Sequence, residues 1–253
     1  MADSMNYYDQ MLARGAINNG AVLLQSEGSI GGQRHVFVDL EGAVKEAFRH
    51  PPIGGLITNP FKGPAKIYAG DLIEHDLGLA NGKGATVKIL KSYKVGVATS
   101  TSTDTAIYLE RNGFVHIPFV GDVLMVAGAT FATKGKGVTV VAVEETVEEE
   151  KDVWKVTLST TLGNLTAGTV LVEAADAGDS VLPMVTNPNC FAPSDYDFPF
   201  YALAGSDSYH TPRLLNTFCM LGGDVVMWKD KMSPVPPAVL AMNKSLYAEF
   251  WHV

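Results

Sequence analysis

Residues 85–99 read ATVKILKSYKVGVAT, and this stretch decides the fold class. It is rich in β-branched residues, and in places it alternates apolar with polar side chains, as half-buried strands do. The same strand-like composition is found in residues 105–110, 138–147 and 153–158. In 138–147 apolar residues occupy both alternating sets of positions, so we expect this strand to be buried on both faces. The sequence therefore predicts a mainly β protein.

Turn signals separate the predicted strands. They are Asn81-Gly82, Asn112-Gly113, the KGKG of residues 134–137, and Gly163-Asn164. Many short strands joined by tight turns are typical of a sandwich or a small barrel. We therefore predict a β-barrel or sandwich core, with an irregular N-terminal extension that contains short helices and with a C-terminal extension.

A degenerate repeat marks where four of the strands begin. Each copy has an apolar lead, a glycine, Asp or Thr, and two apolar residues. The copies are 67–73 (IYAGDLI), 119–124 (FVGDVL), 165–171 (LTAGTVL) and 221–226 (LGGDVV). The pattern predicts a tight turn with positive φ at the glycine, followed at once by a buried strand. The spacing of about fifty residues fits either a duplication or the turns common to any β protein.

The chain is predicted to divide into three segments, and the first two differ in their sequence pattern. Residues 1–64 are interrupted by glycine and proline, and we predict an arm with short helices at 4–14 and 42–49 and a short strand at 34–40. Residues 65–186 are predicted to form the β-barrel or sandwich core.

The third predicted segment, residues 187–253, begins with an aromatic, proline-rich loop. Residues 187–201 read NPNCFAPSDYDFPFY, with almost no periodicity. A loop of this kind is unusual in a compact domain unless it is functional or covered by a partner. A helix near 238–243 and a last strand at 245–253 are predicted to complete this C-terminal segment.

Composition narrows the possible partners. The chain has 253 residues with 19 basic and 27 acidic side chains, a net charge of −8. Binding a phosphate backbone depends on Lys and Arg, so we expect no nucleic acid partner. No apolar run reaches membrane-spanning length and residues 1–10 do not resemble a signal peptide, so we expect no membrane partner and folding in a cytoplasm. Cys190 and Cys219, each beside a phenylalanine, are predicted to be buried rather than reactive.

Motifs for catalysis or cofactor binding are missing from the sequence. None of the six histidines is paired at i, i+2 or i, i+4, or lies near a cysteine with zinc-ligand spacing. There is no G-x-S-x-G motif. Residues 82–84 and 135–137 (both GKG) lead into predicted strands, so we predict hairpin turns rather than phosphate loops. We predict no catalytic residues, no metal ligands and no cofactor, and thus not an enzyme.

Two charged clusters and three tryptophans leave alternatives open. In a strand, Glu74 and Asp76 face away from His75, which favours a solvated turn over a metal site. The acidic run 144–152 lies between two strands and lacks EF-hand spacing, which favours a solvated hairpin tip over a cation site. Core or interface positions are favoured over sugar-stacking platforms for Trp154, Trp228 and Trp251.

The order of elements over residues 66–174 resembles the head-decoration and auxiliary capsid proteins of tailed phages. The likeness is carried by 88–95 (KILKSYKV), 117–124 (IPFVGDVL), 137–143 (GVTVVAV), 156–158 (VTL) and 165–171 (LTAGTVL). Pro236-Pro237 and the final strand also look like the ends of such proteins. The N-terminal extension and the aromatic loop depart from the pattern.

This resemblance implies a virion structural protein that stabilises a phage head by bridging major capsid subunits or other virion proteins. It implies a homo-oligomer, located in the virion and assembled in the host cytoplasm. Other virion components, at the neck, tail or fibre base, and a carbohydrate-binding β module are the alternatives.

Extended arms of such capsid proteins reach their neighbours, so we hypothesise that residues 1–64 and 187–201 contact partners. The aromatic anchors of the second arm would be Phe191, Tyr196, Phe198, Phe200 and Tyr201. The alternative is that both arms wrap this chain's own barrel.

Overall fold

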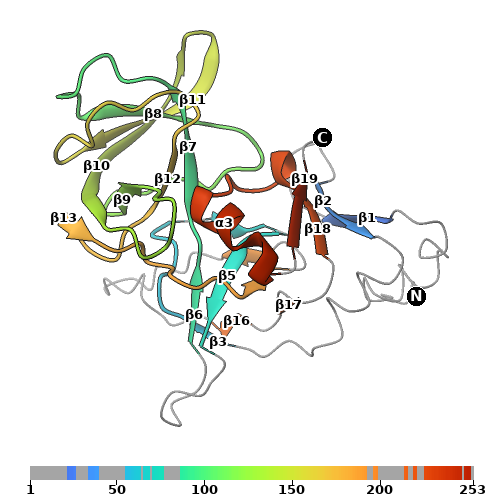
Figure 1. Cartoon of the computed structure of the whole chain (residues 1–253). Helices are drawn as coiled ribbons and strands as arrows, with labels where there is room; N and C mark the ends of the chain where they lie inside the picture. Colours follow the sequence, from blue (N-terminus) through green and yellow to red (C-terminus); the bar gives the residue numbers. More distant parts are fainter. Residues whose placement is uncertain are drawn as a thin grey trace, which may run out of the picture.

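A computed structural model describes most of the middle of the chain and parts of both ends. The described residues are 22–26, 34–39, 55–63, 65–68, 70–76, 86–192, 196–198, 214–215, 219–220, 225–246 and 248–251. They are mainly β, as predicted (Figure 1). The predicted helices at 4–14 and 42–49 lie outside the described residues, whereas the strand predicted at 34–40 is confirmed by β2, Arg34–Asp39.

Six antiparallel strands close into a barrel. They are β7 (Ser92–Val97), β8 (Ala106–Glu110), β9 (Val123–Val126), β10 (Gly135–Glu148), β11 (Lys151–Leu158) and β12 (Val170–Glu173). The order β11-β8-β7-β12-β9-β10 becomes a ring because β10 also pairs with β11. A seventh strand, β13 (Gly178–Val181), pairs with the start of β10. Of the two predicted cores, barrel or sandwich, the described residues form a barrel.

Every second side chain along the strands points into the barrel and fills it. Ile107 and Leu109 point inward from β8, as Val156 and Leu158 do from β11, and all four are buried. Inward alternation of apolar residues is what closes a small barrel around side chains rather than around water. On β10 Val138 and Val140 are buried but Val141 is 54% exposed, so the prediction that this strand is buried on both faces is wrong. Beyond Thr139 no further residue of β10 is in register with β9, and β10 continues in pairing with β11.

A second sheet lies beside the barrel. Its order is β16 (Leu214–Leu215), β3 (Gly55–Ile57), β6 (Thr86–Ile89), β5 (Leu72–His75), β14 (Cys190–Phe191) and β17 (Cys219–Met220). Strands from all three predicted segments meet in this sheet, and β3 pairs with β6 in parallel. The boundaries at 64 and 186 stay predictions.

Leu90 and Lys91 join the sheet to the barrel. The stretch 85–99 contains both β6 and β7, and the chain turns between them where the Lys91 N–H donates to the Ile89 carbonyl at 3.0 Å. An i to i+2 bond of this kind is a tight local bend. One β-rich stretch therefore serves two sheets.

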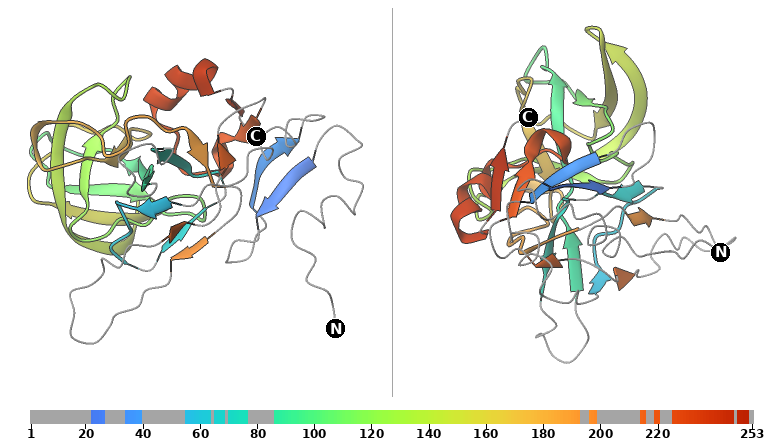
Figure 2. Two further views of the ribbon diagram at one scale, coloured as in Figure 1. Left: turned by 90° about the horizontal axis from the view of Figure 1, so that it is seen from below. Right: turned by 90° about the vertical axis from the view of Figure 1, so that its right-hand side faces the viewer.

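The remaining elements lie outside the barrel and the six-stranded sheet, with β1 (Val22–Ser26) and β2 on the side away from the barrel (Figure 2). β1, β2, β18 (Val225–Trp228) and β19 (Ala248–Trp251) form a four-stranded sheet. β15 (Tyr196–Phe198) pairs with β4 (Ala65–Ile67). The 3-10 helix η2 (Lys229–Lys231) leads towards α3 (Pro237–Leu246), which confirms the predicted helix near 238–243. Because α3 runs to Leu246, the last strand cannot begin at the predicted residue 245, and its described part is β19.

An apolar cluster joins the barrel, the six-stranded sheet and α3. Leu72 comes from β5, Met125 from β9, Phe191 from β14, and Ala238 and Val239 from α3, and all are buried. The two sheets and the helix thus share one core.

The repeated glycine turns have the predicted geometry. Gly70, Gly121 and Gly168 have φ of 86°, 87° and 88°. Each turn closes with a 3.0 Å bond from the N–H of the following residue to a carbonyl three residues earlier, in 68–71, 119–122 and 166–169. A turn with positive φ at its third residue favours glycine. β5, β9 and β12 begin directly after these turns. The turn of the fourth copy, at 221–224, lies outside the described residues.

Each turn makes two equivalent backbone hydrogen bonds with another segment of the chain. The N–H groups of Gly70, Gly121 and Gly168 donate to carbonyls of Ala192, Val140 and Val95, and the N–H groups of those three residues donate to the carbonyls of Asp71, Asp122 and Thr169. The repeat therefore marks equivalent structural positions, whether or not it arose by duplication. By contrast, residues 135–137 lie within β10, so their prediction as a hairpin turn is wrong.

Candidate functional site

The five hypothesised contact aromatics divide between the core and regions whose side chains are not described. Phe191 is 1% exposed and packs in the shared core, between β5 and β17. Tyr196 and Phe198 belong to β15, which pairs with Ile67 and Ala65 of this chain's β4. Phe200 and Tyr201 lie outside the described residues. Phe191 thus follows the alternative, in which this segment packs on its own chain, and the contact role of the other four stays a prediction.

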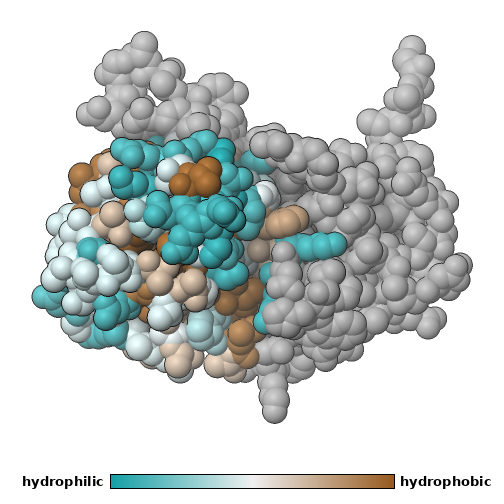
Figure 3. Space-filling view, turned by 90° about the horizontal axis from the view of Figure 1, so that it is seen from above, coloured by the Kyte–Doolittle hydropathy of each residue, from teal (hydrophilic) through white to brown (hydrophobic). Residues whose placement is uncertain are grey.

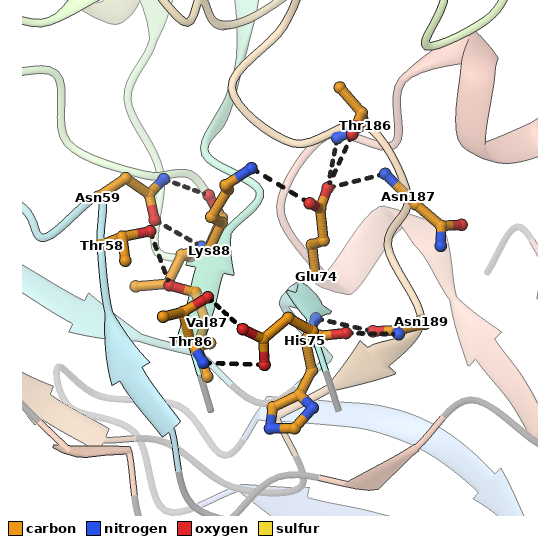
Figure 4. Close-up of polar contacts among 12 residues, drawn as sticks. Thr58, Asn59, Glu74, His75, Thr86, Val87, Lys88, Thr186, Asn187 and Asn189 are labelled. Carbon is orange, nitrogen blue, oxygen red and sulfur yellow. Dashed lines mark hydrogen bonds and ion pairs between the residues drawn. The ribbon is translucent and has the colours of Figure 1, made fainter. Parts of the chain in front are cut away.

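Glu74, His75 and Asp76 do not converge (Figure 4). The Glu74 carboxylate accepts bonds from the N–H groups of Thr186 at 2.5 Å and Asn187 at 2.8 Å, and from Lys88 Nζ at 3.2 Å. His75 points the opposite way and is buried, while Asp76 accepts two bonds from Thr86. The different directions of these side chains confirm the prediction that they do not converge. The prediction that they lie in a solvated turn is wrong, because Glu74 and His75 belong to β5.

Those contacts set the protonation of Glu74. Burial raises the pKa of its carboxyl, but hydrogen bonds from Thr186, Asn187 and Lys88 outweigh burial, so the pKa of Glu74 lies below its ordinary value. Glu74 thus fastens the segment around Thr186 to β5 as a carboxylate.

The acidic run is the tip of the β10–β11 hairpin, as predicted. Glu148 pairs with Lys151, and Glu149 and Glu150 form the two-residue turn with φ of 47° and 61°. Two positive φ values in a two-residue hairpin are typical of a turn that matches strand twist, although glycine or asparagine is the usual choice. No group of three or more His, Cys, Asp or Glu side chains in the described part is arranged to hold a metal ion.

A buried Asp–His–Ser cluster connects three distant parts of the chain. Asp71 follows the first glycine turn, His116 lies in the β8–β9 connection, and Ser233 precedes α3. The Ser233 hydroxyl donates to Asp71 Oδ1 at 2.6 Å, and His116 Nε2 lies 2.9 Å from Asp71 Oδ2. Each of the three residues is at least 96% buried.

The hydrogen bonds of this cluster differ from those of a catalytic triad. His116 Nδ1 accepts the Ser92 N–H at 3.1 Å, so the ring proton sits on Nε2 and is donated to Asp71. In a Ser-His-Asp triad the carboxylate holds Nδ1 and the serine donates to Nε2. Here the Ser233 hydroxyl is directed to Asp71 instead. The cluster holds the sheet, the barrel and the C-terminal segment together.

A second buried cluster lies at the Leu90–Lys91 bend. Lys91 Nζ contacts Glu173 Oε1 at 3.0 Å, and the Asn59 amide Nδ2 donates to Glu173 Oε2 at 2.8 Å. Lys91 Nζ also lies 5.1 Å from the centre of the Phe61 ring. No sequence pattern indicated this cluster, because Asn59, Lys91 and Glu173 lie far apart along the chain and match no motif.

Two further features bear on the rival functions. Trp154 is half-buried against the barrel core, with the Arg111 guanidinium 5.3 Å from its ring, and so lies in a packed position. The side chains of Trp228 and Trp251 are not described. A groove of about 390 Å³ between the barrel and the C-terminal segment is lined partly by Lys94 and Glu110, which pair with each other at 2.9 Å.

The described surface has scattered apolar side chains. Its exposed large ones are Val120, Val126, Val141, Val147, Leu182 and Leu240. On the face seen from above in Figure 3, the described surface is mostly hydrophilic, with small hydrophobic areas between polar ones. Val141 and Val147 both belong to β10.

Among the described residues, no helix has the length and apolar character needed to cross a membrane. No protein-family model, curated protein or solved structure matches the chain.

Proposed function

We propose that this chain is a virion structural protein, a decoration or auxiliary capsid protein that stabilises a phage head through protein–protein contacts. The assignment to a virion rests on the resemblance of residues 66–174. The mode of action rests on one structural feature, the open edge of β10 along the β10–β11 hairpin.

The part of the hairpin that we call the ribbon, residues 141–148 of β10 with 151–157 of β11, has one open edge. β11 pairs with β8 from Val153 to Thr157, so the open edge is that of β10. β9 pairs with β10 only at Val138 and Thr139, and β13 pairs only at Gly135 and Gly137. From Ala142 to Glu148 the pairing of β10 within the described part of the chain is to β11 alone. An edge of unpaired backbone groups is a template for another chain, which adds its own strand or packs across it.

The side chains of the ribbon favour a selective contact. Val141 and Val147 are 54% and 62% exposed, which provides apolar area for a partner to cover. Glu144, Glu145 and Glu148 lie on the same strand. Arg111 pairs with Glu145 at 2.6 Å and Lys155 lies 3.9 Å from Glu144, which neutralises part of this charge. Negative charge along an edge strand opposes pairing between two copies of that edge and favours a partner with basic side chains. The ribbon is therefore suited to a capsid protein surface rather than to a second ribbon.

Copy number in purified virions of the encoding phage tests the assignment. We expect quantitative mass spectrometry to find about as many copies as capsid subunits or capsomers. A few copies per particle would move the protein to the neck, tail or fibre base. Complete absence from the particle would contradict the virion assignment.

Binding to heads that lack the chain tests the contact. We expect the variant with both Val141→Lys and Val147→Lys to lose co-sedimentation with such heads. The matched control is Val126→Lys, another exposed valine, located on β9 outside the ribbon. Equal binding by both variants would show that the ribbon is not the contact surface.

A further inference from the structure

We propose that Lys91 and Asn59 become joined by an intramolecular isopeptide bond, with Glu173 as the residue that transfers the protons. The three side chains, brought together from distant parts of the chain, form a compact set of nucleophile, amide and proton carrier. This inference is independent of the proposed function.

One carboxylate holds both reacting groups. Glu173 Oε1 lies 3.0 Å from Lys91 Nζ, and Glu173 Oε2 lies 2.8 Å from Asn59 Nδ2. Both distances are within the reach required of a general acid or base. The amine that would attack and the nitrogen that would leave therefore contact the two oxygens of the same group.

Backbone contacts fix the positions of both side chains. The Asn59 amide donates to the Ile89 carbonyl and accepts the Ile89 N–H, each at 2.8 Å, as a strand partner would. Lys91 Nζ donates to the carbonyl of Pro60, the residue after Asn59, at 3.1 Å. The amine is thus held beside the Asn59 segment. Fixed placement of two reactants raises their effective concentration by several orders of magnitude.

The site excludes water. Lys91 is 1% exposed, Asn59 4% and Glu173 8%, and the buried ring of Phe61 lies beside the lysine. A charged pair without water is costly, and moving one proton from lysine to glutamate turns it into a neutral amine and a neutral acid. Lysine is nucleophilic only in that neutral form.

The reaction balances without another reagent. Glu173 takes a proton from the Lys91 ammonium, and the Nζ lone pair forms a bond to Asn59 Cγ. Glu173 then relays this proton to Nδ2, the Cγ–Nδ2 bond breaks, and ammonia leaves. Nζ also gives up a second proton through Glu173, and this proton ends on the released ammonia. The products are a Lys–Asn amide, one ammonium ion and a Glu173 carboxylate. No atom is oxidised or reduced.

A neighbouring pair provides the matched control. Lys88 and Glu74 also form an ion pair, at 3.2 Å, but their side chains are 33% and 19% exposed. The other contacts of Glu74 are with the backbone N–H groups of Thr186 and Asn187 and with the Thr186 hydroxyl. This pair has water access and no side-chain amide held on its carboxylate, so it is not expected to react.

Intact-mass spectrometry of the denatured full chain tests the proposal. We expect a mass below that of the sequence by one ammonia, after allowing for the initiator methionine. Tandem spectra of a tryptic digest should show a branched peptide that joins Asn59 to Lys91, with no cleavage after Lys91. The full sequence mass, with separate Asn59 and Lys91 peptides, would overturn the proposal.

An asparagine that cyclises to a succinimide also loses ammonia, and Asn81-Gly82 and Asn112-Gly113 are candidates for that reaction. Mild alkali reopens a succinimide but leaves an isopeptide bond intact. A deficit that alkali removes, without a branched peptide, would therefore count against the bond.

Variants then assign the role of Glu173. We expect Glu173→Gln to have the full sequence mass and Glu74→Gln to keep the deficit, with circular dichroism confirming that both fold. A folded Glu173→Gln protein that still carries the Asn59–Lys91 peptide would refute proton transfer by Glu173. Because an unfolded variant would also lack the bond, the branched peptide of the unmodified chain remains the decisive observation.

Discussion

The junction between the sheet and the barrel contrasts with the β10–β11 ribbon. At the junction, Asp71, His116, Lys91 and Glu173 are buried, and each has a polar partner. On the ribbon, charged side chains face solvent and the outer strand edge is open within the described part. Charge in the first region is buried and maintains the fold. On the ribbon Glu145 pairs with Arg111 and Glu144 approaches Lys155 at the surface, where a partner can reach them. Burial, rather than residue type, distinguishes the two.

The largest effect is expected where a buried charge loses its partner. Lys91→Met removes the nitrogen that contacts the buried Glu173 carboxylate and also removes the proposed bond to Asn59, so we expect a loss of about 4 kcal/mol in the free energy of unfolding. Chemical denaturation measures it. The double variant Lys91→Met, Glu173→Leu should recover much of the loss, and a neutral single variant would show that water reaches this pair.

A somewhat smaller loss is expected from the Asp–His–Ser cluster. Asp71→Ala removes the acceptor of the Tyr68 N–H, the His116 ring and the Ser233 hydroxyl. We expect a cost of about 3 kcal/mol, because the buried donors lose their partner. Thermal unfolding of this variant and of Asp104→Ala, an exposed carboxylate of the 100–104 loop, provides the comparison. Equal losses would mean that the cluster contributes nothing specific.

Glu74 is less buried than the junction residues, and its contribution to stability is expected to depend on pH. Its folded pKa is lowered, so its contribution is present above the unfolded pKa and is lost as pH falls through the folded pKa. We expect Glu74→Gln to cost about 1 kcal/mol at neutral pH. Denaturation at a series of pH values should show the wild-type advantage shrinking in acid. An advantage that grows in acid would contradict the lowered pKa.

The smallest effect on stability is expected on the ribbon. Val147→Lys alters an exposed side chain next to the hairpin turn, so unfolding free energy should change by less than about 0.5 kcal/mol. The same substitution at Val140, which is buried in the barrel, should prevent folding and serves as the contrast. A large loss at Val147 would show that the ribbon supports the barrel itself.

Predictions that depended on short segments succeeded best. The turns at Gly70, Gly121 and Gly168 followed from a few adjacent residues, because positive φ is a local requirement that glycine meets at low cost. The hairpin at 144–152 also needed only neighbouring residues. Phe191 could not be placed in this way, since an aromatic residue in a proline-rich loop suits either a core or a partner.

The two buried clusters had no sequence signal. Asp71 and Ser233 are separated by 162 positions, and Asn59 and Glu173 by 114, without a motif that links them. The strand order places β12 between β7 and β9 and closes β10 on β11, so that these side chains meet.

The sequence by itself determined the β class, most strand positions in the core and the glycine turns, because backbone preference and alternation act over a few residues. Only the tertiary structure decided that the core is a barrel, that Leu90 separates two sheets, and which polar residues meet. Those outcomes depend on pairing between distant strands. Burial turns an ordinary lysine, asparagine and glutamate into the proposed reaction site only after that pairing has formed.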